Sequence, residues 1–179
     1  DTILNFGKLN RKSFDEAAAF LGLPFVAKDV NHQRGEGVYL IKSRIDFGKL
    51  KGSYILQKYI EKSHEYRALI LGRKIGVFEE KIVKDKTDFR YNVALGAEEI
   101  FLDKKKIPSL VKKMILKAAL VLRLDIAGVD VISEKGTGKY YILEVNRGPG
   151  LTYGPKKSPE FKEIAGYLEK TVEKAGVKI

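Results

Sequence analysis

The sequence predicts an α+β fold, in which antiparallel β-hairpins are combined with helices. Two pairs of apolar, strand-like segments flank glycine-containing turns at residues 72–74 and 136–138, which is the pattern of β-hairpins. Apolar residues recur at helical spacing in residues 109–123 and again after Ser158. Because the order is mixed, with helices between the hairpins, we expect antiparallel sheets.

The first third of the chain is expected to hold one helix and three short strands. Ser13 and Glu16 form a capping-box pattern at the start of "SFDEAAAFLG", and Gly22 ends this helix. The strands are expected in "PFVAK", "VYLIK" and "YILQKYI", at residues 24–28, 38–42 and 54–60. The stretch "NHQRGEG" separates the first two strands, and "EKSHE" is expected to be a polar link after the third.

In the remainder, "YRALIL" pairs with "IGVFEEKIV", and "AGVDVI" pairs with "YYILEVN". The polar stretch "KDKTDFRYN" is expected to be a loop. The helix at residues 109–123 carries two apolar ridges, namely Leu110, Met114, Ala118 and Leu122, and Val111, Ile115 and Ala119. The last helix begins at Ser158 and Pro159 and ends near Gly176. We expect it to bury Phe161, Ile164, Ala165, Leu168 and Val172.

Composition indicates a globular protein with a basic surface, for which charge alone favours a solvated Lys-rich surface over a dedicated binding site. The 179 residues suit one domain or two small lobes, and 34 Lys and Arg against 23 Asp and Glu give a net charge of +11. Such an excess favours nucleotides, acidic peptides or nucleic acid. The basic residues are scattered, with small clusters at residues 104–106, 112–113 and 156–157, which is also typical of a solvated surface. No dense basic face with stacking aromatics is evident, so nucleic acid is not the expected partner.

The chain has no cysteine, which excludes disulfides and thiolate metal ligands and favours a reducing, cytoplasmic location. No apolar run is long enough to cross a membrane and no signal peptide is evident, so no membrane association is expected. The N-terminal "DTILNFG" lacks an initiator Met, and we therefore expect a fragment or a processed form of a longer protein.

The stretch "YYILEVNRGPGL" places Glu144 inside an apolar strand, where a bare buried carboxylate would be costly. Centring the hairpin turn on Thr137 places Asp130 opposite Glu144, with Asn146 on the same face. The opposite face, directed into the core, would then carry Val129, Val131, Leu143 and Val145.

Two directly opposed carboxylates repel each other, and a hard divalent cation removes that repulsion. Oxygen ligands of this kind suit Mg²⁺ or Mn²⁺, so Asp130, Glu144 and Asn146 are candidate metal ligands. Two alternatives remain open: one carboxylate pairs with a lysine, or the register differs by one residue.

Mg²⁺ commonly binds through one or two carboxylates together with substrate phosphates, so a phosphate cradle is expected elsewhere. The best candidate is "HQRGEG", where Gly35 and Gly37 permit close approach of backbone N–H groups to a phosphate. Lys28, on the preceding strand, would supply a positive charge to the same phosphates. A glycine-containing loop alone is more often a plain turn.

Seven short motifs carry a family resemblance: "PFVAK", "RGEGVYL", "ILQKYI", "EYRALILG", "DFRYN", "AGVDVI" and "LEVNRGPGL". In this order, over residues 24–153, they resemble the ATP-grasp superfamily, and within it the branch of ribosomal-protein glutamate ligases and lysine-biosynthesis ligases. The resemblance implies a nucleotide held between two antiparallel sheets, with a smaller lobe at residues 1–62 and a larger one at 63–179.

The resemblance also implies roles for individual residues. The expected ATP contacts are Lys28, His32, Arg34, Gly35 and Gly37 at the phosphates, Gln57, Lys58, Tyr59 and Ile60 at adenine, and Glu65 at the ribose. Arg67, Arg90 and Asn92 match positions that handle phosphates or the transferred phosphoryl group, and they are the implied catalytic residues. Asp130, Glu144 and Asn146 match the metal ligands of the family.

The implied activity is ATP-dependent ligation of a carboxylate to an amine through an acylphosphate, with Mg²⁺ or Mn²⁺ as cofactor. The implied substrates include an acidic peptide or protein. The chain departs from the family pattern at Arg147, where small residues are common, and by beginning too late to contain the usual N-terminal domain. The alternatives are a related small-molecule kinase and a basic, non-catalytic nucleic-acid-binding module.

Overall fold

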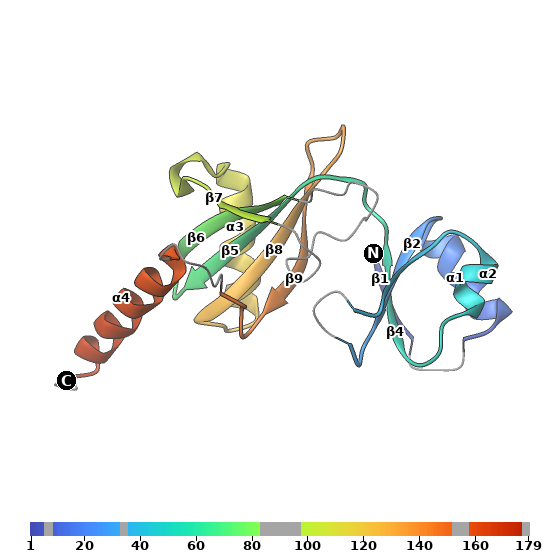
Figure 1. Ribbon diagram of the computed structural model, residues 1–179, viewed down its shortest axis with the longest axis horizontal. Helices are drawn as coiled ribbons and strands as arrows, with labels where there is room; N and C mark the ends of the chain where they lie inside the picture. The colour runs from blue at the N-terminus through green and yellow to red at the C-terminus, as the bar shows by residue number, and fades with distance from the viewer. Residues whose placement is uncertain (6–8, 33–35, 83–97, 152–157, 177–179) are drawn as a thin grey trace. The chain divides into compact units, whose positions relative to one another are not determined.

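The computed structural model describes residues 1–5, 9–32, 36–82, 98–151 and 158–176 (Figure 1). These residues form two compact units, of which the first is Asp1–Glu61 and the second begins at Lys62. Each unit has its own antiparallel sheet and its own helices. The predicted α+β class with antiparallel sheets is therefore confirmed.

The first unit is built on a four-stranded sheet in the order β1-β4-β2-β3. Its elements are β1 (Thr2–Asn5), α1 (Arg11–Leu21), β2 (Phe25–Asp29), β3 (Val38–Ile41), α2 (Arg44–Gly48) and β4 (Tyr54–Lys58). Strand β1 and helix α2 are additions to the predicted elements. Helix α1 begins earlier than predicted, because Asn10 rather than Ser13 is its N-cap and Ser13 takes the third position of the capping box.

One hydrophobic core joins the helices of the first unit to its sheet. Its buried members are Phe14, Ala17, Leu21, Phe25, Ala27, Ile41, Phe47, Leu50, Tyr54 and Leu56. The Phe14 and Phe47 rings meet edge to face with centroids 5.5 Å apart, which joins α1 to α2. This core supports β2 and β4, the strands that carry Lys28 and Gln57.

The second unit is built on a five-stranded sheet in the order β7-β6-β5-β8-β9. Its elements are β5 (Lys62–Leu71), β6 (Lys74–Ile82), β7 (Glu98–Phe101), the 3₁₀ helix η2 (Lys104–Lys106), α3 (Ser109–Val121), β8 (Ile126–Glu134), β9 (Tyr140–Asn146) and α4 (Pro159–Lys174). Both predicted hairpins are present, as β5–β6 and β8–β9. The link predicted at "EKSHE" is wrong from Lys62 onward, because β5 already begins there and pairs with β8.

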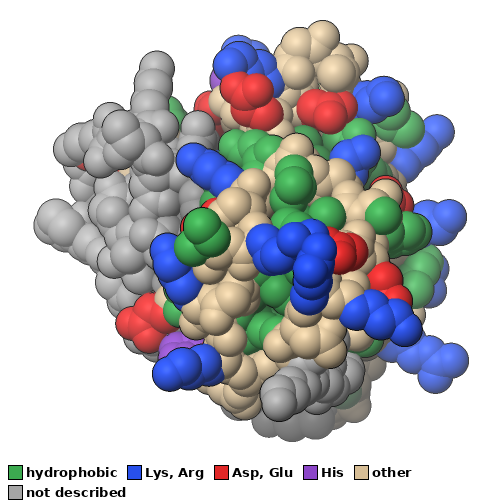
Figure 2. All heavy atoms as spheres, turned by 90° about the vertical axis from the view of Figure 1, so that its right-hand side faces the viewer, with side chains coloured by type: hydrophobic (Ala, Val, Ile, Leu, Met, Phe, Trp, Pro, Cys, Tyr) green, Lys and Arg blue, Asp and Glu red, His purple; other side chains and the backbone are tan. Residues whose placement is uncertain are grey.

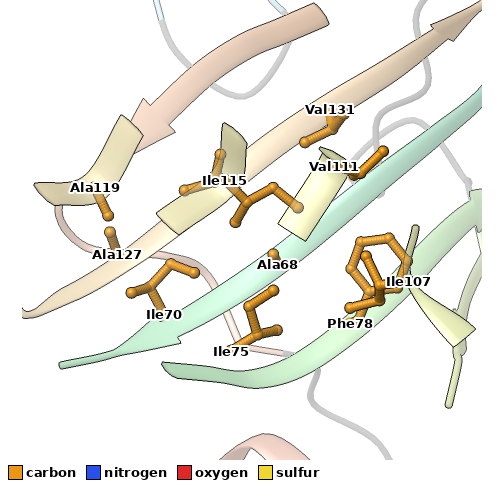
Figure 3. Packing of buried hydrophobic residues seen from close by; sticks show 11 residues of the cluster. Ala68, Ile70, Ile75, Phe78, Ile107, Val111, Ile115, Ala119, Ala127 and Val131 are labelled. Atoms are coloured by element: carbon orange, nitrogen blue, oxygen red, sulfur yellow. The ribbon is translucent and has the colours of Figure 1, made fainter. Parts of the chain in front are cut away.

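Helix α3 covers one face of this sheet and forms the main core with it (Figure 3). Val111, Ile115 and Ala119 are buried against the strands, as the second predicted ridge requires. The first predicted ridge lies further out, and Leu110 is 71% exposed. Each fully buried Val or Ile contributes about 1.5–3 kcal/mol to stability, so this ridge holds the helix to the sheet.

Helix α4 packs at one end of the second sheet through Ile164 and Tyr167, which contact a small cluster of Leu69, Leu71 and Val77. The predicted buried face of α4 is largely wrong. Phe161 and Leu168 are each 47% exposed, and Ala165 is exposed as well. Helical periodicity predicts the helix correctly, but it does not show which of the apolar side chains pack against the sheet.

The β8–β9 hairpin pairs Asp130 with Glu144, as the centred turn predicts. The register then shifts, because Val131 pairs with Ile142 and leaves Leu143 as a bulged residue. Ile142, not Leu143, therefore packs against the core together with Val145. The predicted core-facing position is therefore correct for Val145 and wrong for Leu143.

Basic side chains lie scattered among acidic and apolar ones on the face of the molecule drawn in Figure 2. This distribution agrees with the scattered Lys and Arg of the sequence. Among the described helices, none is both long enough and apolar enough to cross a membrane.

Candidate functional site

The second sheet carries a row of charged side chains on the face opposite α3. Alternation along each strand places the apolar residues Ala68, Phe78, Val129 and Val131 under α3 and the charged residues Glu65, Arg67, Glu79, Lys81 and Asp130 on the other face. Four of these charged residues are buried, namely Glu65, Glu79, Lys81 and Asp130. Charged residues are rarely buried without a partner, so this face has a specific role in the unit.

Asp130 is the centre of an ionic network. Arg67 donates to it through two nitrogens, from Nε to Oδ1 at 2.8 Å and from Nη2 to Oδ2 at 2.9 Å. Lys81 donates from Nζ to the same Oδ1 at 3.1 Å. The alternative that a carboxylate pairs with a lysine is therefore realised at Asp130, with an arginine in addition.

The ionic partners of Asp130 outweigh the cost of its burial. Burial by itself would raise the pKa of the Asp130 carboxyl, but the hydrogen bonds from Arg67 and the charge of Lys81 lower this pKa to about 2. The Asp130 carboxylate is therefore ionised at neutral pH. The same contacts raise the pKa of Arg67 despite its burial.

Glu65 belongs to the same network. Lys81 Nζ donates to its Oε1 at 2.9 Å, and Lys62 Nζ donates to its Oε2 at 2.6 Å. Lys81, on β6, thus bridges Glu65 on β5 and Asp130 on β8, the next two strands in the sheet order β6-β5-β8. The proposed ribose contact of Glu65 remains a prediction.

Glu144 and Asn146 lie beside Asp130 on β9, but their environment differs. Glu144 is exposed, and Asn146 donates from Nδ2 to Glu144 Oε1 at 2.7 Å. The buried carboxylate expected at Glu144 is instead found at its cross-strand partner Asp130, which is 1% exposed. One buried and one exposed carboxylate stand opposite each other.

These three residues fit a hard divalent cation by their chemistry. They offer only carboxylate and amide oxygens, and Asp130 is ionised, which are the requirements of Mg²⁺ or Mn²⁺. Within the described part of the chain, no cluster of three or more His, Cys, Asp or Glu side chains could hold a metal. A cation here would therefore need the amide oxygen of Asn146 and oxygens from a substrate.

Glu79 lies on the same charged face and was not anticipated from the sequence. It is 1% exposed, and neither of its carboxylate oxygens has a hydrogen-bond partner among the described residues. Burial first, and then the charges of Glu99 and Glu160, raise the pKa of Glu79 to about 8. The signal available in the sequence was the run "FEEK", which interrupts an apolar strand just as Glu144 does.

The candidate phosphate loop leaves β2 at Asp29, whose side chain shapes the turn. Asp29 Oδ1 accepts from the Asn31 N–H at 2.8 Å, and Asp29 Oδ2 lies 3.1 Å from His32 Nδ1. Gly37 has a φ of 67°, and a Cβ there would lie 2.8 Å from the Asp29 Cβ. The need for glycine at this position therefore has a steric cause. Arg34 and Gly35 lie outside the described residues.

Lys28 and the proposed adenine-binding segment lie on neighbouring strands of the first sheet. Lys28 pairs with Val38 on one side and with Ile55 on the other. Gln57 lies within β4, next to its last residue, and its Nε2 donates to Thr2 Oγ1 at 3.3 Å. Lys58 is the last residue of β4, and the described Tyr59 and Ile60 follow the strand.

The described site residues of the second sheet form a connected set. Lys81 joins Glu65 to Asp130 and Arg67 binds Asp130 directly, while Glu144 contacts Asn146 and also interacts with the Asp130 carboxyl. Arg90 and Asn92, two of the implied catalytic residues, lie outside the described residues. Lys62 and Lys81 are the network members that the sequence did not indicate.

The two antiparallel sheets with their helices have the fold of the ATP-grasp proteins. The chain is similar in structure to an ATP-grasp ligase, PsnB, complexed with a minimal precursor, with a TM-score of 0.67, 15% identity, and coverage of 96% of this chain and 54% of that one. D-alanine–D-alanine ligase from Bacillus anthracis matches with a TM-score of 0.67 and 22% identity over 97% of this chain and 60% of that one. At these identities the likeness shows the fold.

Within that class, residues 3–162 match the model of the RimK-like ATP-grasp domain, and the chain belongs to this family. A probable alpha-L-glutamate ligase from Enterobacter sp. (strain 638) is 34% identical over 163 residues, covering 86% of this chain and 51% of the relative. A ribosomal protein bS6–L-glutamate ligase from Escherichia fergusonii is 32% identical with the same coverage. The chain thus spans about half the length of these curated relatives.

Proposed function

We propose that this chain forms the nucleotide-binding part of an ADP-forming carboxylate–amine ligase. The observation that carries the proposal is the pairing of Asp130 with Glu144 on the charged face of a RimK-like ATP-grasp domain. In the reaction, a substrate carboxylate attacks the γ-phosphate of ATP to form an acylphosphate. An amine then displaces phosphate, and an amide results.

The acidic and the basic residues of the chain would have different roles in this reaction. Asp130, Glu144 and Asn146 would hold Mg²⁺ or Mn²⁺, which neutralises charge on the ATP phosphates when it is bound. Lys28, with the loop that ends at Gly37, would contact the phosphates from the first unit. Arg67, together with Arg90 and Asn92, would orient the transferred phosphoryl group, which is chiefly a matter of position and charge.

The remaining assignments follow the same scheme. His32, Arg34 and Gly35 would lie at the phosphates, the segment Gln57, Lys58, Tyr59 and Ile60 at adenine, and Glu65 at the ribose. The smaller lobe would span residues 1–62 and the larger one residues 63–179. We also propose a cytoplasmic location, where ATP and Mg²⁺ are available.

The proposed acceptor is an acidic peptide or protein that receives an amino acid. The net charge of +11 favours an anionic partner. Arg147, directly after the candidate metal ligand Asn146, adds a positive charge where such a partner would meet the nucleotide. Two similar proteins have names or descriptions that fit a peptide or protein substrate, a ribosomal protein bS6–L-glutamate ligase and an ATP-grasp ligase complexed with a precursor peptide.

The experiment is a product assay with the chain, Mg-ATP, glutamate and acidic peptides as acceptors. We expect ATP binding that depends on Mg²⁺, and release of ADP and phosphate with an amide product by mass spectrometry. A stable phosphoester in place of the amide would identify a kinase. Failure to bind Mg-ATP at all would contradict the proposal.

A further inference from the structure

Glu79 lies on the charged face but has no role in the proposed function. Its side chain is 1% exposed, and its carboxylate oxygens accept no hydrogen bond from the described residues. Glu65 and Asp130, on the same face, each accept from two cationic side chains. A buried polar group without a partner is costly, so the presence of Glu79 needs a reason.

The strand register places Glu79 directly opposite Arg67, across the β5–β6 pair. Side chains in such pairs have Cβ atoms about 5 Å apart, within reach of a long guanidinium. The other charged groups that act on Glu79 are Lys81, which attracts its negative charge, and Glu99 and Glu160, which repel it. With its pKa raised to about 8, Glu79 is protonated at neutral pH and does not compete with Asp130 for Arg67.

A divalent cation on Asp130 would change this balance. Asp130 already accepts from Arg67 and Lys81, so the cation would share one carboxylate with two positive groups. Like charges at this separation repel each other strongly in a buried site. A second acceptor would then stabilise the Arg67 guanidinium. Glu79 is paired with Arg67 across the strands, and neither of its carboxylate oxygens accepts a hydrogen bond from the described residues.

We propose that Glu79 is a positioning residue for the metal site, to which Arg67 turns its guanidinium when a divalent cation binds Asp130. This inference rests on the proposed function, because it takes Asp130 as a metal ligand. In the step, Glu79 releases its proton to solvent, and its carboxylate replaces the share of negative charge that Asp130 gives to the cation. Arg67 stays ordered beside the site instead of being expelled from it.

The test is a calorimetric titration of Mg²⁺ into the chain saturated with a non-hydrolysable ATP analogue. Glu79→Gln should weaken Mg²⁺ binding about tenfold, within the usual range for coupled groups, because a neutral amide cannot balance Arg67. Glu79→Asp should restore part of the affinity. The matched control is Glu163→Gln, which removes a partly exposed carboxylate whose ionic partner is Lys104, and its affinity should stay close to wild type.

A second readout separates this role from simple packing. Titrations at pH 7 in buffers of different ionisation enthalpy should show that the wild-type chain releases about one more proton per Mg²⁺ bound than Glu79→Gln does. Wild-type affinity and proton release in Glu79→Gln would overturn the inference and leave the proposed function intact. An equal loss of affinity in Glu163→Gln would also overturn it. If the wild-type chain binds no Mg²⁺, the proposed function itself fails, and the inference fails with it.

Discussion

At the residue scale, the two opposed carboxylates of the β8–β9 hairpin differ in what holds them. Asp130 is buried and bound by Arg67 and Lys81, whereas Glu144 is exposed and contacts Asn146. Asp130 therefore has a structural role in addition to the proposed metal role. Glu144 has little structural role by comparison, so substitutions can separate stability from metal binding.

Asp130→Asn should lower the free energy of unfolding by about 3–5 kcal/mol, because Arg67 and Lys81 lose their shared counter-charge in a buried site. Glu144→Gln, on the exposed side of the same pair, should change it by less than about 0.5 kcal/mol. Both should weaken Mg²⁺ binding. Urea denaturation of the two variants measures the difference, and equal destabilisation would contradict it.

The Asp130 contribution also sets a pH dependence with a definite sign. Its pKa is lowered from 3.8 to about 2 in the folded chain. The folded state therefore gains stability from this carboxylate above about pH 4, and loses that gain as the pH falls through about 2. Acid unfolding followed by circular dichroism should begin at higher pH in Arg67→Met than in wild type, because the carboxylate loses its main donor. An unchanged acid midpoint would show that Arg67 does not stabilise the ionised form.

Glu79 should have the opposite pH dependence. Its pKa is raised from 4.5 to about 8 in the folded chain, so the folded state retains a proton that the unfolded state has lost. Stability from this group is complete below about pH 4.5 and declines as the pH rises toward 8. Glu79→Gln should therefore raise the free energy of unfolding at pH 8 by about 1–3 kcal/mol, and the melting temperature with it. At pH 4.5 the variant and the wild type should differ little. A gain of equal size at both pH values would rule out titration as its cause.

At the scale of elements, local signals located most strands and helices, but neighbours decided which faces are buried. Periodicity predicts the helix at α4, yet Phe161 and Leu168 are half exposed, while Ile164 and Tyr167 pack against the apolar cluster of the sheet. In β9 the bulge at Leu143 exchanges the core-facing position for Ile142. The turn after β2 depends on Gly37 for a steric reason that is local enough to test.

Gly37→Ala should destabilise the chain by about 1–3 kcal/mol, because φ is 67° and a Cβ would collide with Asp29 and His32. The matched control is Gly48→Ala, since a Cβ at Gly48 meets no heavy atom within 4 Å. Thermal unfolding compares the two, and affinity for ATP reports whether the loop shape matters for phosphate binding. Equal melting temperatures would contradict the steric argument.

At the scale of the whole molecule, each unit has its own core and its own share of the candidate nucleotide contacts. Lys28 and Gln57 lie in the first unit, while Glu65, Asp130 and Glu144 lie in the second. A ligand that binds only the folded chain stabilises it by an amount that grows with its affinity. The proposed function therefore has a consequence for stability.

Mg²⁺ and ATP together should raise the melting temperature more than the sum of either alone. A ligand at one hundred times its dissociation constant stabilises the folded state by about 2.7 kcal/mol, which differential scanning fluorimetry resolves. Glu144→Gln should remove most of the cooperative part and leave the effect of ATP alone. Simple addition of the two effects in the wild-type chain would contradict a shared site.

The sequence by itself determined the α+β class, the two hairpins and the opposition of Asp130 to Glu144. These depend on alternation and on turn glycines such as Gly136 and Gly138, whose effects act over a few residues. The motif order was also sufficient to indicate the family that the later comparison confirmed.

Only the tertiary structure decided what surrounds Asp130. Lys81 is 49 residues and Arg67 63 residues away in the chain, and they meet Asp130 because β5 lies between β6 and β8 in the sheet. Strand order of this kind depends on the packing of the whole unit and not on local pattern. For the same reason Glu79 reads in the sequence as one more polar residue, while in the fold it is a buried carboxylate opposite Arg67.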